Sequence, residues 1–379
     1  MELYLDPMHP GLRYGYTTGT CAALAAKAAA QALLSGKIPD SVSVRTPKGI
    51  TVCVPVEKGT LQNGAAVCAV RKDSGDDPDI TNGVLVYAEV KQAPGEEVRV
   101  DGGIGVGRVT KKGLACPVGE AAINPGPREQ IRHAVLAAAE ELESVGGFEV
   151  VISIPEGERL AKRTFNPRLG IEGGLSVLGT SGIVEPMSDA ALLESIRLEI
   201  KVLHAAGNER LLITPGNYGE TFAKQQLGLS DAPMAQCSNF IGDTLDILHR
   251  EGIKGILLVG HIGKLIKVAG GMMNTHSKYG DCRMEILCAY AALFGVPQGS
   301  LRRMMESVTT EAALDVLKET DKLEPVMDAV TQKIAQEVKR RAPELPAELV
   351  LFSQTHGTVG KTAGADRMIA LFRELREER

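Results

Sequence analysis

Two different rhythms of hydrophobic residues divide this chain, and they constrain its fold more than any other feature. Over residues 42–100 short β-branched runs follow one another, such as SVSVRT, ITVCVPV and GVLVYAEVK, with the turn sequences TPKG, EKGT and APGEE between runs. Beyond residue 183 apolar helical segments alternate with short buried strands. Strands joined by tight turns build antiparallel sheets, whereas helix–strand alternation requires crossover connections and a mostly parallel sheet.

The first part, taken as residues 1–170, is predicted to be an α+β domain. Its Ala-rich segment TCAALAAKAAAQALL, residues 20–34, is typical of a helix that is capped by a nearby threonine and ended by Gly36. About five short strands follow, and then a helix over residues 127–145 and the strand FEVVISIP. We therefore expect a helix and a largely antiparallel sheet in this domain.

The second part, residues 171–379, is predicted to be an α/β domain with a mostly parallel sheet flanked by helices. The junction between the domains is expected between residues 155 and 186. Predicted helices cover residues 188–206, 240–250, 281–294 and 363–378, and predicted strands cover 211–214, 253–259 and, as the last one, 349–353. With 379 residues the chain is long enough for two cores of ordinary size.

Composition excludes several classes of protein. The net charge of −5 provides no general attraction to nucleic acid. Seven cysteines, odd in number and never spaced CxxC, argue against a disulfide scaffold or a structural zinc site. The first residues lack the basic-then-apolar pattern of a signal peptide, and the longest uncharged stretch, residues 286–301, falls short of a membrane span. We therefore expect a cytoplasmic protein that contacts neither nucleic acid nor membrane.

Two glycine-containing corners are the best candidates for a small-ligand site. In LLITPGNYGETFAKQQ, residues 211–226, and ILLVGHIGKL, residues 256–265, a buried strand runs through a Gly turn towards a helix. This geometry binds ligands at the strand ends of open α/β sheets. The alternative is that each glycine only serves a tight turn. A third Gly-rich segment, DGGIGVGRVTKKGL, is better explained as strand–turn–strand than as a dinucleotide fingerprint.

Histidines and charged loops offer further candidates. His261 lies at the second corner and His276 precedes a predicted helix, and each is either a general base or a cap or loop contact. The loop KDSGDDPDITNG, residues 72–83, carries four aspartates but lacks the EF-hand pattern, so turn chemistry is favoured over metal binding. Residues 155–188 combine cations with Gly-rich turns, which suits either a polycarboxylate ligand or a charged connector.

Several unusual strings resemble the CbiD family, in order along nearly the whole chain. They include RYGYTTGTCAALAAKAAA, KDSGDDPDITNG, DGGIGVGRVTKKGL with INPGPR, and AKRTFNPRLGIEGGLSVLGTSGIVEPMS. TPGNYG, CSNFIGD and LLVGHIGKLIKVAGGMMNTHSKYGDCRMEILCAYAALFG continue the resemblance. One departure is TNG at the end of the acidic loop, where the family is expected to have THG. The segment SQTHGTVGK, residues 353–361, also matches poorly, and we assign it no role.

The resemblance implies a methyltransferase of anaerobic cobalamin biosynthesis. Such an enzyme moves a methyl group from S-adenosylmethionine (SAM) to carbon 1 of cobalt-precorrin-5B, and the products are cobalt-precorrin-6A and S-adenosylhomocysteine. The family lacks the glycine motif of common SAM-dependent enzymes, and this chain likewise shows no strand–GxGxG–helix unit followed by an acidic residue. Cobalt arrives inside the substrate, so no protein-bound metal is expected.

Hypothetical ligand contacts follow from this reaction. A flat corrinoid with many carboxylates needs cations at its rim, and it is expected between the two domains. The candidate substrate-binding residues are Arg13, Thr17, Thr18, Arg108, Lys111, Lys112, Lys162, Arg163 and Arg168. The candidate SAM-binding residues at the two corners are Thr214, Gly216, Asn217, Gly219, Gly260 and Gly263. Methyl transfer from a sulfonium needs positioning more than acid–base chemistry, and His261 or His276 is the candidate for any base.

Two other functions stay open at this stage. A non-catalytic corrinoid carrier or pathway scaffold would bind the tetrapyrrole without SAM. A nucleotide-dependent phosphotransferase would also fit the Gly corners and basic loops, although the chain has no GxxxxGK[ST] loop. The Ala-rich helices are compatible with a homo-oligomer as well as with packing inside one chain.

Overall fold

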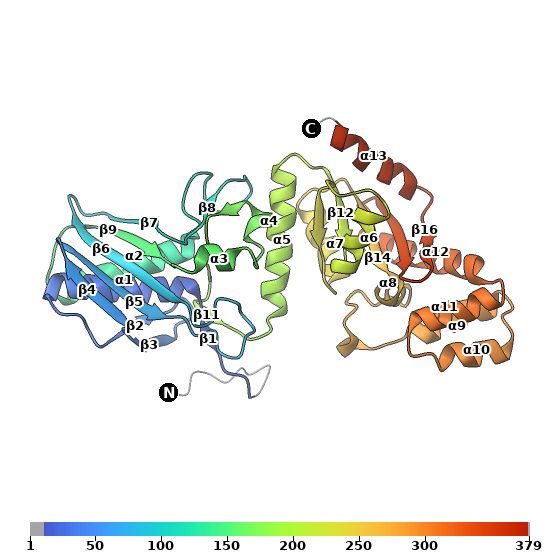
Figure 1. Ribbon diagram of the computed structural model, residues 1–379, viewed down its shortest axis with the longest axis horizontal. Helices are drawn as coiled ribbons and strands as arrows, with labels where there is room; N and C mark the ends of the chain where they lie inside the picture. Colours follow the sequence, from blue (N-terminus) through green and yellow to red (C-terminus); the bar gives the residue numbers. More distant parts are fainter. Residues whose placement is uncertain (1–10, 378–379) are drawn as a thin grey trace. The chain divides into compact units, whose positions relative to one another are not determined.

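The computed structural model describes residues 11–377, and it divides them into two compact units, one ending at Asp189 and the other beginning at Ala190 (Figure 1). The first unit thus extends beyond residue 170, where we expected the boundary. The reason is strand pairing: β10 (Ile171–Glu172) pairs with β8 (Arg108–Val109), and β11 (Ile183–Val184) pairs with β1 (Gly15–Tyr16). Residues 171–184 therefore complete the first unit.

The first unit is built on a five-stranded sheet in the order β4-β5-β6-β9-β7. Its strands are β4 (Lys58–Gln62), β5 (Ala65–Arg71), β6 (Leu85–Ala93), β9 (Gly147–Ser153) and β7 (Val98–Gly102). All neighbours run antiparallel except β7 and β9, which are parallel. A separate hairpin pairs β2 (Ser41–Arg45) with β3 (Thr51–Pro55). The expected α+β domain with a largely antiparallel sheet is confirmed.

Helix α1 (Thr18–Ser35) is the centre of the first core. Its N-cap is Thr17, whose side-chain oxygen accepts the amide of Thr20, and its C-cap is Gly36 in the left-handed conformation. Nearly the whole length of the helix is buried, because alanine side chains are small enough for β5, β6 and α2 (Pro125–Glu141) to pack closely around it. Two short helices, α3 (Gly157–Ala161) and α4 (Asn166–Leu169), follow β9.

The second unit is a five-stranded sheet in the order β13-β12-β14-β15-β16. The strands are β12 (Arg210–Thr214), β13 (Met234–Gln236), β14 (Gly255–His261), β15 (Ala347–Ser353) and β16 (Gly357–Lys361). The first four are parallel, and β16 returns antiparallel to β15. The predicted mostly parallel sheet is confirmed, but the prediction that β15 is the last strand was wrong, since the hairpin to β16 follows it.

Helices cover both faces of this sheet. The helices of the second unit are α5 (Asp189–Ala205), α6 (Asn217–Gln225), α7 (Ile241–Arg250), α8 (Ile262–Ala269), α9 (Arg283–Leu293), α10 (Gln298–Met305), α11 (Thr310–Glu319), α12 (Leu323–Arg341) and α13 (Ala365–Glu377). Leu212, Leu257 and Val350 pack with α6 and α13 on one face. Leu211 and Leu258 pack on the other face, in a larger hydrophobic core that includes α7, α8 and α12. Alternate residues of each strand therefore enter two different cores.

The helical segment between β14 and β15 is larger than the sequence pattern indicated. The sequence indicated a helix after the second glycine corner, which is α8, and one over residues 281–294, which is α9. The structure adds α10, α11 and α12, which together fill most of the connection. α11 begins at the N-cap Thr309, whose side chain accepts the amide of Ala312.

Candidate functional site

The carboxyl edge of the second sheet contains a topological switch point between β12 and β14. From β12 the chain passes through α6 to β13 on one side, and then through α7 to β14 on the other side of β12. Loops that leave such adjacent strands in opposite directions separate, and open α/β sheets bind their ligands there. Both glycine corners predicted from the sequence, β12–α6 and β14–α8, lie at this point.

The β12–α6 corner presents free backbone donors. Gly216, the N-cap of α6, has φ 111°, a conformation that favours glycine, and it provides no side-chain cap. The amides of Asn217 and Tyr218 meet no acceptor among residues 11–377, so they are available to an anion. The hydroxyl of Thr214, at the end of β12, is fully buried and also has no hydrogen-bond partner in that range.

Packing explains two of the other glycines proposed as SAM contacts. A Cβ on Gly219 would lie 2.7 Å from the Val259 carbonyl oxygen, and one on Gly260 would lie 2.7 Å from a Leu265 methyl carbon. Both positions are therefore filled by the protein itself. The amide of Gly263 is also engaged, because it donates to Nδ1 of His261 at 3.1 Å. Of the four corner glycines, Gly216 has the most open surroundings.

Lys264, in the first turn of α8, links the loops around the switch point. Its ammonium donates to the carbonyl oxygen of Pro215 at 2.8 Å and, more weakly, to that of Ser238 at 3.5 Å. Burial lowers the pKa of this lysine. The sequence analysis did not select Lys264, although it stands in the GHIGKL corner; its position relative to Pro215 depends on the crossover.

His261 is held through both of its ring nitrogens. It is the N-cap of α8: Nδ1 accepts the Gly263 amide, and Nε2 lies 3.0 Å from Glu311 Oε1. Since Nδ1 is an acceptor, we assign the proton to Nε2, which then donates to the carboxylate. With both nitrogens engaged inside the protein, neither is free to take a proton from a ligand.

Glu311 was missed by the sequence analysis, and it anchors this edge. Burial alone would raise its pKa, but the hydroxyls of Ser353 and Thr355, the Gln354 amide and His261 together lower it to about 2. The glutamate thereby ties α11 to the β15–β16 turn and to the β14–α8 corner. Three of these donors stand in residues 353–361, to which we had assigned no role.

His276 lies in a loop at the same edge. Its Nδ1 caps the short turn η1 (Ser277–Tyr279) by accepting the Lys278 amide at 3.1 Å, while Nε2 has no partner among the described residues. The loop is fixed by the buried Lys267, which donates to the Gly280 carbonyl oxygen at 3.0 Å. The Thr275 amide also donates to Asn239, just beyond β13. His276 therefore combines exposure with one available ring nitrogen.

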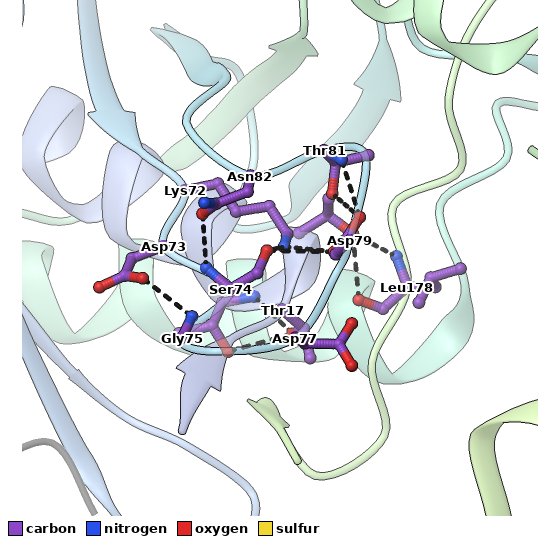
Figure 2. Close-up of polar contacts among 12 residues, drawn as sticks. Thr17, Lys72, Asp73, Ser74, Gly75, Asp77, Asp79, Thr81, Asn82 and Leu178 are labelled. Atoms are coloured by element: carbon purple, nitrogen blue, oxygen red, sulfur yellow. Dashed lines mark hydrogen bonds and ion pairs between the residues drawn. The ribbon is translucent and has the colours of Figure 1, made fainter. Parts of the chain in front are cut away.

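The first unit places the acidic loop against the start of α1 (Figure 2). Lys72 is almost completely buried and pairs with Asp79 at 2.7 Å and with Ser74. Burial would raise the pKa of Asp79, but the Lys72 charge and hydrogen bonds bring it below its ordinary value. A hydrogen bond from Arg13 likewise lowers the pKa of Asp73. The loop is thus organised by internal ion pairs and turn hydrogen bonds, and the described residues contain no cluster of three His, Cys, Asp or Glu suited to a metal.

The three substrate contacts proposed near the N-terminus have partners within the first unit. Arg13 forms a bidentate pair with Asp73. Thr17 caps α1 and Thr18 exchanges hydrogen bonds with the backbone of Leu178 at 3.0 and 3.2 Å. Both threonines are buried. Their first role is therefore to fix the start of α1 against the 178–182 turn.

The other proposed substrate-binding side chains differ in whether they already have a partner within the protein. Arg108 pairs with Asp101 through both nitrogens, at 2.9 and 3.0 Å. Pairing of β8 with β10 brings Lys111 beside residues 168–170, where its ammonium lies 3.5 Å from the Arg168 carbonyl oxygen. Three further cations are exposed and form no ion pair within residues 11–377: Lys112, Lys162 and Arg163.

A cavity of about 430 Å³ lies at the N-terminus of α2, and the sequence analysis did not foresee it. Its lining includes Cys116, Ile123, Arg128 and Arg132. Arg128 is committed to structure, because it donates to the carbonyl oxygens of Ile123 and Val100 at 2.9 and 2.6 Å. The cations of this cavity therefore act mainly as braces for the surrounding loops.

The chain combines an α+β unit that has exposed cations with an open α/β unit. The switch point of the α/β unit has free backbone amides, a lysine and a glycine. These features define a two-unit protein of the small-ligand-binding class. Sequence comparison specifies the class further. The family model described as CbiD matches residues 6–186, and that described as CbiD, C-terminal domain, matches residues 274–363. The chain belongs to the CbiD family.

Curated relatives match over most of their length. A protein of Ruminiclostridium cellulolyticum is 48% identical over 89% of this chain and 87% of its own, and one of Alkaliphilus metalliredigens is 41% identical over 98% of both. Each is named cobalt-precorrin-5B C(1)-methyltransferase. Among solved structures, the cobalamin biosynthesis protein (cbiD) from Archaeoglobus fulgidus is 34% identical and covers 73% of this chain and 87% of its own, with a TM-score of 0.41.

One further observation concerns membranes. No helix among residues 11–377 is long and apolar enough to cross a bilayer.

Proposed function

We propose that this chain transfers the methyl group of SAM to carbon 1 of cobalt-precorrin-5B, with cobalt-precorrin-6A and S-adenosylhomocysteine as products. The observation that carries the proposal is the match to relatives named for this reaction over nearly the full length of both chains. The ring carbon supplies the electron pair of the new C–C bond, and the pair of the broken S–CH₃ bond stays on sulfur. The carrier and phosphotransferase alternatives are not favoured by these relatives.

The proposed SAM site is the carboxyl edge of the second sheet. The orphaned hydroxyl of Thr214, the open surroundings of Gly216 and the free amide of Asn217 are the groups that suit a ligand with polar substituents. Gly219, Gly260 and Gly263 support the site by packing and by orienting the corners. This assignment retains the second unit as the SAM-binding one.

The proposed tetrapyrrole surface lies on the first unit. Lys112, Lys162 and Arg163 are free to pair with carboxylates, and Lys111, Arg168 and Arg108 lie on the same or neighbouring segments. Phe165, between these cations in sequence, has 41% of its surface exposed and offers an apolar contact for a flat ring. Thr17 and Thr18 hold the turn over residues 178–182, and Arg13 holds the acidic loop through Asp73.

The chain's own residues bind and orient the reactants more than they exchange protons. If the ring must lose a proton, His276 is the candidate base, because His261 uses both nitrogens inside the protein. The metal belongs to the substrate, as the word cobalt in the relatives' name implies. We further propose a cytoplasmic enzyme without a resident metal, acting on no nucleic acid or membrane and able to form homo-oligomers.

Mass spectrometry tests the reaction directly. The purified chain is incubated with cobalt-precorrin-5B and SAM, and a gain of one methyl group with one equivalent of S-adenosylhomocysteine is expected. A parallel reaction with ATP and Mg²⁺ in place of SAM should leave the tetrapyrrole unchanged. Binding of the tetrapyrrole without methyl gain would favour the carrier, and phosphate transfer would favour the phosphotransferase.

A further inference from the structure

Lys264 is a half-buried cation without a counter-ion. Other lysines of the second unit pair with carboxylates, for example Lys224 with Glu220 and Lys254 with Glu209, both at 2.6 Å. No carboxylate within the described residues lies within ion-pair distance of Lys264, whose two acceptors are neutral carbonyl oxygens. A partly desolvated charge whose only partners are neutral dipoles is strongly stabilised when an anion binds to it.

The surroundings of this ammonium favour an anionic group of a ligand. An ammonium has three donors, and only the bond to Pro215 is short; the contact to Ser238 is at the limit of a hydrogen bond. A Cβ added to Gly216 would find the Lys264 nitrogen as its nearest neighbour, at 3.9 Å, so the space between the two corners is open. The free amides of Asn217 and Tyr218 belong to the same corner and favour negative charge.

We propose that Lys264 recognises the carboxylate of the amino-acid part of SAM. This inference rests on the proposed function, and it deepens it by naming a residue for one end of the cofactor. Lys264 spans the switch point from β14 to the loop after β12, where a bound SAM would lie. A carboxylate there would take the donor that the two carbonyl oxygens leave unused, and the helix α6 amides would complete its shell.

Two ligands that differ in the carboxylate test this role. S-adenosylhomocysteine carries it, whereas 5′-methylthioadenosine keeps the nucleoside and sulfur but has a methyl group in place of the amino-acid part, and so lacks both its carboxylate and its ammonium group. By isothermal titration calorimetry, Lys264→Met should weaken binding of S-adenosylhomocysteine about 10- to 100-fold and leave that of methylthioadenosine unchanged. Lys264→Arg, which keeps the charge, should retain part of the preference.

Lys254→Met is the matched control, because Lys254 precedes the opposite end of the same strand, β14, and is exposed. It should change neither affinity. Equal weakening of both ligands by Lys264→Met would show a merely structural role through Pro215 and would overturn the inference, as would no effect on either. If Lys264→Met does not fold, Lys264→Arg is the test: a retained preference for S-adenosylhomocysteine over methylthioadenosine supports the proposal, and loss of that preference overturns it. A wild-type chain that binds neither ligand would instead overturn the proposed SAM dependence.

Discussion

Glu311 shows how a single side chain can organise an edge of the sheet. It accepts hydrogen bonds from two hydroxyls, a backbone amide and a histidine, and these come from two different loops. Four donors around one carboxylate favour its charged form, which is why its pKa falls despite burial. His261 consequently caps α8 and connects the β14–α8 corner to Glu311 of α11.

Replacing this carboxylate by Glu311→Gln should lower the free energy of unfolding by about 1–3 kcal/mol, because the amide cannot accept all four donors. Urea denaturation measures the change at neutral pH. The pH dependence follows from the depressed pKa of Glu311, about 2 against an ordinary 4.5: its stabilisation is present above pH 4.5 and is lost as the pH falls towards 2. The wild type should therefore lose more stability over this interval than the variant.

Glu306→Gln provides the control for Glu311→Gln. Glu306 is exposed at the end of α10 and has no ion pair within the described residues. Its replacement should change neither the free energy of unfolding at neutral pH nor the decrease of that free energy at acid pH. If Glu311→Gln and the wild type lost the same unfolding free energy between pH 4.5 and 2, the hydrogen bonds assigned to Glu311 would be wrong.

At the scale of elements, glycines with the same place in a helix serve different purposes. Gly219 and Gly299 both lie in the first turn of a helix, α6 and α10. Gly219 is pressed against β12 and β14, whereas a Cβ on Gly299 would meet no atom within 4 Å. From the sequence TPGNYG alone, a glycine required by packing, such as Gly219, cannot be distinguished from one that faces a ligand, as proposed for Gly216.

The two glycines predict opposite effects of alanine. Gly219→Ala should destabilise the chain by about 1–3 kcal/mol, because the new Cβ would lie 2.7 Å from the Val259 carbonyl oxygen. Gly299→Ala should stabilise it by about 0.5–1 kcal/mol, since alanine loses less entropy in a helix. Thermal unfolding of both variants decides the matter: a neutral Gly219→Ala would mean that α6 does not pack on the strands as described.

At the scale of the whole molecule, the two units carry separate proposed binding surfaces. Because the two proposed surfaces use different residues, a change in one of them should affect the affinity for one ligand only. Lys162→Ala combined with Arg163→Ala should weaken binding of cobalt-precorrin-5B about 3- to 20-fold, as expected for exposed ion pairs, without changing affinity for S-adenosylhomocysteine. Spectroscopic titration of the tetrapyrrole and calorimetry of the nucleoside measure the two affinities.

Two exposed cations elsewhere on the first unit, Lys37 and Lys58, give the matched double variant. Lys37→Ala with Lys58→Ala removes the same charge but should leave both affinities unchanged. If the two double variants weakened tetrapyrrole binding equally, the effect would be one of net charge, and the proposed surface around Lys162 would be wrong. Higher salt should reduce the difference between wild type and the first variant.

The sequence by itself determined the class of each unit and the corners at the sheet edge. Strand-length runs joined by tight turns favour antiparallel neighbours, and alternating helices and strands favour crossover connections. Periodicity was therefore sufficient to indicate the class of each sheet, but not the insertion of β9 between β6 and β7. It also indicated the helix α1, whose alanines and capping threonine act within a few residues of one another. Long, unusual strings were sufficient to indicate the family.

Tertiary structure alone decided which residues meet. Lys264 reaches Pro215 across 49 positions and Glu311 reaches His261 across 50, and no local pattern records such a pairing. The same is true of the unit boundary, because residues 171–184 join the first unit through strands that begin far earlier in the chain. Local periodicity reflects the period of the backbone, whereas a site reflects crossovers that bring distant loops to one edge of a sheet.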